Sequence, residues 1–249
     1  MRRAFGAMLV GGALLAATPA TGDERAAPRR GEHATVPVPG DQPAFVVHGA
    51  HDDARVLVYL HGRCGDPLAG IRAFADEASE RGTLVSVQAD LPCPERKGRR
   101  RWSGDVARAA ARVEAAIAAV AAARGRPLAS SGRTIIGYSE GALRAESIAK
   151  RLPLVYPRAV LLASPRAPRG DSFTRGSRVA LVVGQLDVQA EMRAGDAHLA
   201  QAGVDHHLFT LPGARHGTYG TDGRRAMREV LGWLYASADG APTRSTSRE

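Results

Sequence analysis

Short apolar runs alternate with longer segments of helical periodicity along most of this chain. The run at residues 55–60 (Arg-Val-Leu-Val-Tyr-Leu) is almost continuously apolar, as is typical of a strand buried on both faces. After an opening hairpin at 33–38 and 44–47, strands are predicted at residues 55–60, 83–89, 133–138, 159–163, 178–183 and 206–211. Helices are predicted at residues 67–81, 105–124, 140–152, 189–202 and 219–235.

The alternation of strands and helices predicts the class of fold. Strands joined by helices form a parallel sheet that is covered on both faces, and the active sites of such sheets lie at the carboxyl ends of the strands. The helix predicted at 67–81 ends at Gly82 and carries an apolar face at helical spacing, formed by Leu68, Ile71, Phe74 and Ala78.

The first 20 residues have the pattern of an export signal. Arg2 and Arg3 form a charged start, residues 4–17 are apolar, and Thr-Pro-Ala at 18–20 resembles a cleavage site. The apolar run is short for a membrane span, although an uncleaved anchor or a buried helix is the alternative. We therefore expect a periplasmic or secreted protein without stable membrane insertion.

The remaining chain is divided by composition. Residues 21–32 are polar and rich in Gly, Arg and Ala, and we expect a linker there. Residues 33–237 hold all the predicted strands and helices and form one domain, which is long enough to bury a sizeable core. Residues 238–249 are predicted to be a loose tail.

The charge of the chain has one consequence for its partners. The formal net charge is +9, a balance that is common among nucleic-acid-binding proteins. Apart from Lys97 and Lys150, however, every positive residue is Arg, and the Arg residues are spread along the chain except for a cluster at 96–101. We therefore expect no nucleic-acid partner.

The chain has two cysteines, Cys64 and Cys93. Each follows the end of a predicted strand, on what would be the same edge of the sheet. Outside the cytoplasm two such cysteines most simply form a disulfide, with two unpaired buried thiols as the alternative.

The segment Gly137-Tyr138-Ser139-Glu140-Gly141 carries the most specific chemical signal. It follows an apolar run and precedes a predicted helix, which is the strand, turn and helix context of a Gly-x-Ser-x-Gly nucleophile elbow. In such an elbow the two glycines avoid collisions with the neighbouring strand and helix. The serine hydroxyl then lies near a helix N-terminus, which favours developing negative charge.

A serine nucleophile needs a base, and the base needs an orienting carboxylate. The strand at 178–183 is followed by Asp187, and the strand at 206–211 is followed by His216. Both are therefore expected at the edge of the sheet formed by the carboxyl ends of its strands. The order Ser, Asp, His is that of the α/β-hydrolases. His206 and His207 fall inside the last strand, and Asp171 is the alternative position for the acid.

With these motifs the chain resembles the α/β-hydrolase superfamily, most closely its small lidless esterase branch, which includes dienelactone-hydrolase-like and secreted esterase-like members. The resemblance covers residues 33–237. It implies an α/β fold with a central, mostly parallel sheet flanked by helices and no sizeable lid domain. It also implies Ser139 as nucleophile, His216 as base and Asp187 as acid, with no metal or organic cofactor.

The resemblance also implies an oxyanion hole of two backbone N–H groups. The residue after the nucleophile, Glu140, supplies one of them. The turn His61-Gly62-Arg63-Cys64 supplies the other, from Arg63 or alternatively from Cys64. We expect His61 itself to be a structural residue that hydrogen-bonds within the turn.

Two features near this edge bear on the substrate. The carboxylate of Glu140 is unusual after a nucleophile: it could disfavour anionic substrates, point to solvent or pair with an Arg. The loop at 96–101 is rich in Arg and precedes Trp102, so it could recruit an acidic or aromatic ester with Trp102 as a side wall, or be a solvated charge run.

The sequence therefore predicts an exported serine hydrolase, a carboxylesterase acting on small-molecule or polymer-end esters. A serine peptidase on the same fold and a non-catalytic binding protein are the alternatives. The oligomeric state is not predicted.

Overall fold

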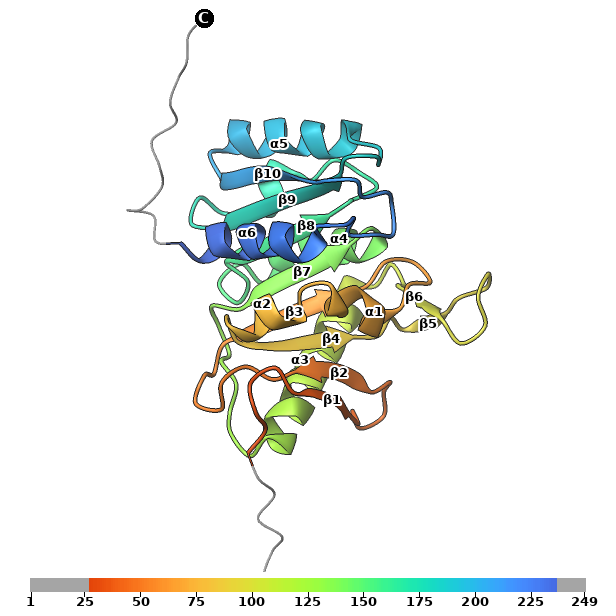
Figure 1. Ribbon diagram of the computed structural model, residues 1–249, viewed down its shortest axis with the longest axis vertical. Helices are drawn as coiled ribbons and strands as arrows, with labels where there is room; N and C mark the ends of the chain where they lie inside the picture. Colours follow the sequence, from red (N-terminus) through yellow and green to blue (C-terminus); the bar gives the residue numbers. More distant parts are fainter. Residues whose placement is uncertain (1–26, 237–249) are drawn as a thin grey trace, which may run out of the picture.

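The computed structural model describes residues 27–236. Its centre is an eight-stranded sheet in the order β1-β2-β4-β3-β7-β8-β9-β10 (Figure 1). These strands are β1 His33–Val36, β2 Ala44–Val47, β3 Val56–Leu60, β4 Thr83–Val87, β7 Thr134–Tyr138, β8 Arg158–Leu162, β9 Arg178–Gly184 and β10 Asp205–Leu211. The hairpin β1–β2 and the pair β2–β4 are antiparallel, and all other pairs are parallel. The predicted mostly parallel sheet is thereby confirmed.

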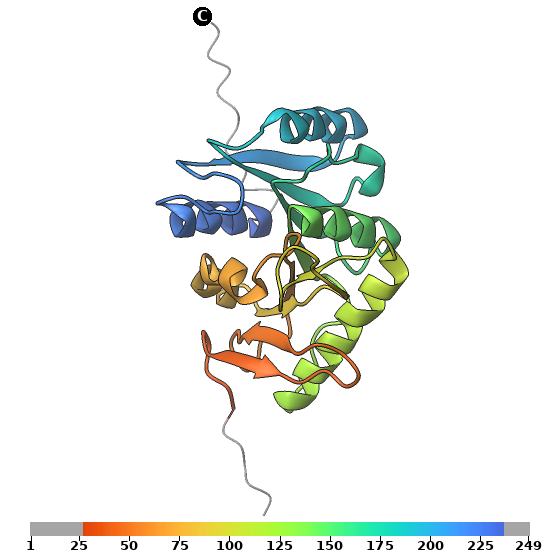
Figure 2. The same cartoon turned by 90° about the vertical axis from the view of Figure 1, so that its right-hand side faces the viewer.

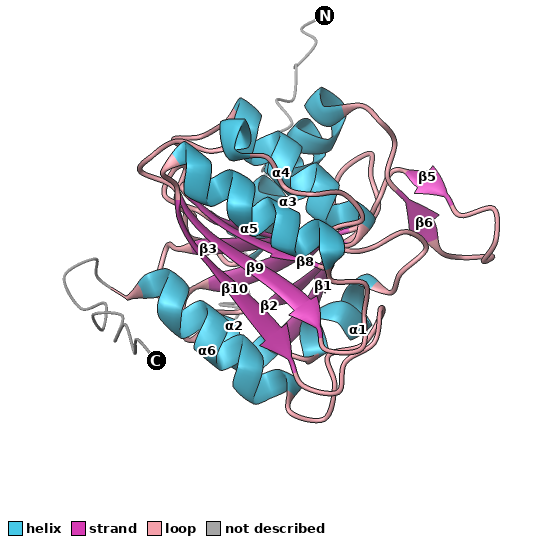
Figure 3. Cartoon of the chain, turned by 90° about the horizontal axis from the view of Figure 1, so that it is seen from above, coloured by secondary structure: helices cyan, strands magenta, loops and turns pink. Residues whose placement is uncertain are grey.

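Helices cover both faces of the sheet, as Figures 2 and 3 show. One face carries α1 Pro67–Arg72, α2 Ala75–Ser79 and α6 Gly223–Tyr235, and the other carries α3 Val106–Ala123, α4 Glu140–Arg151 and α5 Ala190–Ala202. Each face has its own apolar core. Because both faces are covered, every residue of β3, β4 and β7 is buried, which explains why these strands are mainly apolar.

The helix predicted at 67–81 is wrong in its continuity, since the structure divides it into α1 and α2. Its predicted inner face is right, because Ile71, Phe74 and Ala78 are fully buried. At the break Phe74 leaves helical geometry (φ −144°, ψ 21°), and its ring packs 5.8 Å from the ring of Tyr59, measured between centroids. Tertiary packing of this ring therefore overrides local helical periodicity.

The last helix begins later than predicted, at Gly223 instead of residue 219. Gly220 has a φ of +72°, and a Cβ atom there would lie 2.1 Å from the carbonyl oxygen of Pro212. A residue in this left-handed conformation cannot continue a helix, so the chain turns before α6 begins.

No sizeable lid covers the sheet among residues 27–236. The segment between β8 and β9, where a lid was not expected, holds only the short 3₁₀ turn η1 Gly170–Ser172. The loop between β4 and α3 adds a small two-stranded ribbon of β5 Leu91–Pro92 and β6 Arg100–Arg101, which was not predicted (Figure 3). None of the helices in the described part of the chain is long and apolar enough to cross a membrane.

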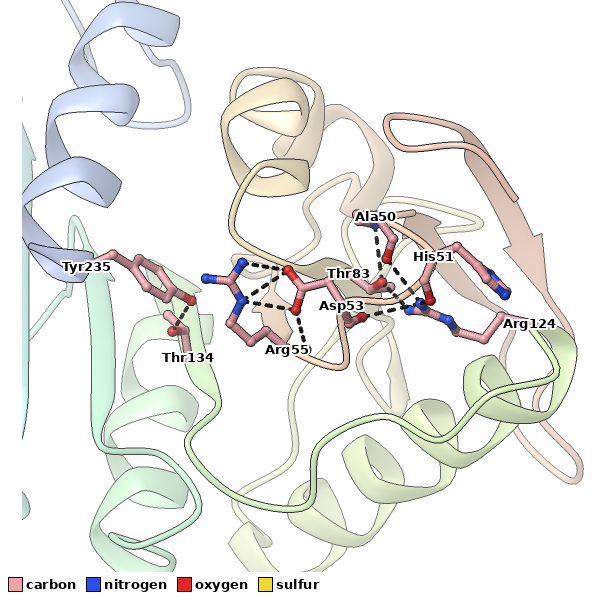
Figure 4. Close-up of polar contacts among 9 residues, drawn as sticks. Ala50, His51, Asp53, Arg55, Thr83, Arg124, Thr134 and Tyr235 are labelled. Atoms are coloured by element: carbon pink, nitrogen blue, oxygen red, sulfur yellow. Dashed lines mark hydrogen bonds and ion pairs between the residues drawn. The ribbon is translucent and has the colours of Figure 1, made fainter. Parts of the chain in front are cut away.

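Arg124 hydrogen-bonds to the loop between β2 and β3, at the edge of the sheet where the parallel strands begin (Figure 4). It follows α3 and is 5% exposed. Its Nη1 donates to Thr83 Oγ1 at 2.6 Å, and its Nη2 donates to the carbonyl oxygens of Ala50, His51 and Asp53 at 3.2, 2.6 and 3.2 Å. Burial lowers the pKa of this guanidinium from its ordinary value, although the group remains charged.

The ends of the chain fall partly beyond the described residues. The predicted signal peptide at 1–20, residues 21–26 of the predicted linker and the predicted tail at 238–249 lie outside them. Within the rest of that linker, the N–H of Gly31 donates to the carbonyl oxygen of His48, and the N–H of His48 donates to that of Glu32. Backbone pairing with the domain thus begins before β1.

Candidate active site

Ser139 occupies a strained turn between β7 and α4, with φ 53° and ψ −119°. A Cβ atom on Gly137 would lie 2.3 Å from the carbonyl oxygen of Gly141. One on Gly141 would lie 2.0 Å from the carbonyl oxygen of Leu60, at the end of β3. Both glycines are therefore required by close backbone contacts, as predicted for an elbow. Although Ser139 precedes α4, its side chain makes no capping hydrogen bond, so its hydroxyl is free to bond elsewhere.

The side chains of Ser139, His216 and Asp187 form one hydrogen-bonded chain. His216 Nε2 lies 3.0 Å from Ser139 Oγ, and His216 Nδ1 lies 2.9 Å from Asp187 Oδ2. The other oxygen of Asp187 accepts the backbone N–H of Val188 at 2.7 Å. The imidazole is half exposed (52%), whereas the carboxylate is 9% exposed. Such a chain can move a proton from the hydroxyl to the imidazole while the carboxylate stabilises the cation that forms.

Backbone contacts hold the loops of Asp187 and His216 together. The N–H of Leu186 donates to the carbonyl oxygen of Ala214, and the side-chain oxygen of Gln185 accepts the N–H of Gly213 at 2.9 Å. Sequence reasoning did not identify Gln185 as part of the site. Its only signal is its position directly after the strand that leads to the acid.

Tyr138 is a second residue that sequence reasoning missed. Its hydroxyl accepts the backbone N–H of Gly217, and its ring centroid lies 5.6 Å from that of His216. Burial raises the pKa of Tyr138, so the phenol stays neutral at physiological pH. The residue before the nucleophile thus also holds the loop of the histidine.

The alternative acid and bases lie elsewhere. Asp171 is in η1, and its carboxylate forms ion pairs with Arg169 and Lys150. Hydrogen bonds from the same two cations hold the pKa of Asp171 well below the usual range. His206 and His207 lie within β10, as predicted. The side chain of His206 bonds to the carbonyl oxygen of Val204 and to Asp196, so neither it nor Asp171 is the partner of Ser139.

The turn after β3 lies directly against the elbow. A Cβ atom on Gly62 would lie 3.2 Å from the Cβ of Ser139. His61 is 1% exposed, and its Nε2 accepts the N–H of Ala89 at 3.0 Å. Its Nδ1 therefore carries the ring proton and donates to the carbonyl oxygen of Gly62 at 2.7 Å. Burial lowers the pKa of His61 to about 4, so the ring is neutral and structural, as expected.

Cys64 and Cys93 form a disulfide with Cα atoms 5.4 Å apart. One oxygen of Glu95 lies 3.3 and 3.2 Å from the two sulfur atoms. These three residues are the one grouping of metal-ligand type among residues 27–236, but the sulfur atoms are bonded to each other and supply no thiolate. The disulfide instead joins the turn after β3 to the β4–α3 loop.

A cavity of about 700 Å³ opens beside Ser139. The rings of three tyrosines line it, namely Tyr59, Tyr138 and Tyr219, together with Gly70, whose lack of a side chain leaves room for the Tyr59 hydroxyl. Arg63, Glu95 and Arg96 lie at its border. The cavity is therefore mainly aromatic and apolar, with charged groups nearby.

Trp102 does not border this cavity, which contradicts its predicted role as a side wall for the substrate. Its side chain is 2% exposed and belongs to the core, and its indole N–H donates to the carbonyl oxygen of His61 at 2.7 Å. A polar N–H on a large apolar ring favours this kind of buried, hydrogen-bonded position.

The side chain of Glu140 is partly buried and has a backbone partner that the sequence did not predict. Its Oε2 accepts the backbone N–H of Trp102 at 2.9 Å, and it makes no ion pair within the described part of the chain. It does not border the cavity. Among the described residues, one carboxylate oxygen is therefore bonded to a backbone N–H and none to an Arg side chain.

The Arg residues of the cluster at 96–101 differ in their surroundings, since some bond to the protein and one is exposed at the cavity. Arg99 pairs with Asp66 at 2.8 Å, and the guanidinium of Arg100 donates to the carbonyl oxygens of Ala89 and Asp90 at 2.6 and 2.7 Å. Arg96 is exposed and borders the cavity. The cluster is therefore not a uniform solvated run, and Arg96 alone among these three is placed to meet a substrate.

No protein-family model and no curated protein sequence matches this chain. Solved structures share its fold. They include esterase PE8 (TM-score 0.58, 18% identity, 76% of this chain and 97% of the other) and a carboxylesterase from Mesorhizobium loti (0.57, 20%, 76% and 94%). A fluorophosphonate-binding serine hydrolase from Staphylococcus aureus, FphF, also matches (0.59, 11%, 83% and 98%). At these identities the likeness is one of fold, and the chain has the α/β-hydrolase fold.

Proposed function

We propose that this protein is an exported serine hydrolase that cleaves carboxylic esters. The observation that carries the proposal is the hydrogen-bonded chain of Ser139, His216 and Asp187 on a strained elbow. The structural neighbours named as esterases and serine hydrolases support it. A peptidase would need a site for a chain terminus in addition, and no observation favours one.

In the proposed reaction Ser139 Oγ attacks the acyl carbon while His216 Nε2 takes the hydroxyl proton. The tetrahedral intermediate collapses, the bond between the acyl carbon and the alcohol oxygen breaks, and His216 returns the proton to the leaving alcohol. A water then attacks the acyl-enzyme with His216 again as base, which releases the acid and restores the Ser139 hydroxyl. Asp187 holds the imidazole throughout.

The backbone N–H groups of Arg63 and Glu140 are the proposed oxyanion donors. The choice of Arg63 over Cys64 is supported by the backbone, since the Cys64 N–H donates to the carbonyl oxygen of Arg100 at 2.9 Å. A donor that is already bonded cannot also serve the oxyanion. Gly62 packs against Ser139, which brings the Arg63 turn next to the elbow.

The open, aromatic cavity supports small substrates. Because residues 27–236 contain no lid that would form an enclosed acyl tunnel, we propose short-chain, aryl or polymer-end esters as the substrate class. Strong activation by emulsions of long-chain triglycerides would contradict this part of the proposal.

Covalent labelling tests the function directly. A fluorophosphonate probe is expected to label the folded protein, and the label is expected to be lost in Ser139→Ala. Ser147→Ala, a serine on α4 whose hydroxyl bonds to Leu143, is the matched control and should label like the wild type. A panel of paired aryl esters and anilides separates esterase from peptidase activity. Absence of labelling in the wild-type protein would refute the proposal.

Export is tested separately. We expect the protein made from the full sequence to be found in the periplasm or medium, with its amino terminus near residue 21. An intact amino terminus in the cytoplasmic fraction would contradict export without affecting the hydrolase proposal. The disulfide of Cys64 and Cys93 is consistent with an oxidising compartment.

A further inference from the structure

One short segment contacts both turns that carry the proposed oxyanion donors. This segment, residues 99–103, follows the tip of the β4–α3 loop and is here named the bridging segment. The carbonyl oxygen of Arg100 accepts the N–H of Cys64, and the indole N–H of Trp102 donates to the carbonyl oxygen of His61. These two bonds flank Arg63 on both sides of its turn.

The same segment is fastened to the elbow by one side chain. Glu140 Oε2 accepts the backbone N–H of Trp102 at 2.9 Å. Trp102 therefore has its backbone bonded to the elbow and its indole bonded to the turn after β3. Because the ring is buried in the core, it provides a rigid link between the two.

The bridging segment is itself well fixed. The Cys64–Cys93 disulfide ties the turn to the same loop, and the carbonyl oxygen of Arg99 accepts the N–H of Cys93 at 2.9 Å. The N–H of Ser103 donates to the carboxylate of Asp90 at 2.8 Å. Because the bridging segment is held at both ends, a shift of one of the two turns would also shift the other.

We propose that the Glu140 side chain is a positioning residue, which acts through Trp102 to set the spacing of the two oxyanion N–H groups. The inference rests on the proposed function, and it assigns the Glu140 carboxylate a role separate from that of its backbone N–H. An oxyanion hole works only when its donors already point to where the charge will form. Binding the carboxylate to Trp102 also keeps a negative charge from turning toward the oxyanion, which it would repel.

The test compares Glu140→Ala with Glu140→Gln on a short aryl ester. The amide oxygen of Gln can accept the same N–H, whereas Ala cannot. We expect Glu140→Ala to lower kcat by about 10–100-fold with KM changed by less than about twofold, because the lost contact matters in the transition state. Glu140→Gln should lose much less, at most about threefold in kcat. Trp102→Phe, which keeps a ring but loses the indole N–H, should lower kcat in the same direction as Glu140→Ala.

Glu146→Ala is the matched control for a purely structural effect. Glu146 is on the same helix, and its carboxylate accepts the backbone N–H of Arg169 and the hydroxyl of Ser172, both at 2.8 Å. Its loss should lower stability without lowering kcat per folded molecule. Affinity for an alkylboronic acid, which forms a tetrahedral adduct with the serine, should fall in parallel with kcat in Glu140→Ala and Trp102→Phe and stay unchanged in Glu146→Ala.

The outcomes separate this inference from the proposed function. If Ser139→Ala retains activity, the function itself is wrong. If Ser139→Ala is inactive but Glu140→Ala keeps its kcat, or if Gln and Ala at position 140 are equally impaired, the positioning role is wrong. Should Glu140→Ala fail to fold, the comparison of Glu140→Gln with Trp102→Phe decides, since the inference requires the second to lose more kcat than the first.

Discussion

The hydroxyl of Tyr138 accepts a hydrogen bond from the backbone N–H of Gly217, the residue after His216. Gly217 has a φ of +88°, so the loop turns sharply at this point. The residue before the proposed nucleophile thus holds the loop that carries the proposed base. Strand β7 and the last loop are in this way joined directly beneath the site.

Removing this acceptor should slow the reaction without unfolding the protein. We expect Tyr138→Phe to lower kcat/KM for an aryl ester by about 3–30-fold, because the His216 loop loses its anchor and the imidazole is less often placed for proton transfer. Tyr235→Phe is the control: its hydroxyl bonds to Thr134 at the opposite edge of the sheet (Figure 4). Equal losses in both variants would show that the effect is general to tyrosine hydroxyls in this fold.

Two glycine-to-alanine changes should have opposite effects on stability. At Gly141 a Cβ atom would lie 2.0 Å from a backbone oxygen of β3, which cannot move aside, so Gly141→Ala should cost more than about 3 kcal/mol and abolish labelling of Ser139. At Gly232, in α6, a Cβ atom would meet nothing within 4 Å. Gly232→Ala should therefore stabilise by roughly 0.5–1 kcal/mol through helix propensity. Urea denaturation of both variants checks this, and a stable, labelled Gly141→Ala would contradict the geometry of the elbow.

The pKa of His61 predicts a loss of stability in acid. Burial lowers it from 6.5 to about 4, so between these pH values the unfolded chain binds the proton and the folded protein does not. The contribution of neutral His61 to the free energy of unfolding is fully present above pH 6.5. It is lost as the pH falls toward 4, and the total loss is about 3 kcal/mol. His61→Gln cannot titrate and should show a flatter dependence of unfolding free energy on pH over this window. The comparison removes the contribution of His48, whose pKa burial also lowers. Parallel curves for the two proteins would exclude His61 as the source.

Arg124 should be important for stability and unimportant for catalysis. Its guanidinium bonds to three carbonyl oxygens and one hydroxyl, all at the edge opposite Ser139. We expect Arg124→Ala to lower the free energy of unfolding by about 3 kcal/mol, because buried acceptors lose their donors. Arg124→Lys should recover only part of this, since one ammonium cannot reach all four partners. The exposed Arg126→Ala is the control, and kcat per folded molecule should be the same in all three variants.

Much of the fold could be predicted from local pattern. The strands of a doubly covered parallel sheet are mainly apolar, so β3, β4 and β7 were visible as runs in the sequence. Because strand ends share an edge, the positions of Ser139, Asp187 and His216 after three different strands predicted that they meet. The structure joins them in one hydrogen-bonded chain.

Features that depend on contacts between distant segments could not be predicted. The break at Phe74 follows from its packing against Tyr59, and the burial of Trp102 follows from its bonds to His61 and Glu140. A large aromatic residue beside an Arg-rich loop has the same local sequence whether it faces a substrate or the core. Only its tertiary partners decide between these positions.

The order of the main strands and helices, the elbow at Ser139 and the edge at which the site forms were predictable from the sequence, because they depend on periodicity, glycine geometry and the common direction of parallel strands. The directions of the Tyr138, Trp102 and Glu140 side chains, by contrast, depend on contacts between distant segments. Each of these side chains bonds to a backbone group dozens of residues away along the chain, and such a partner exists only once the sheet and its loops have assembled.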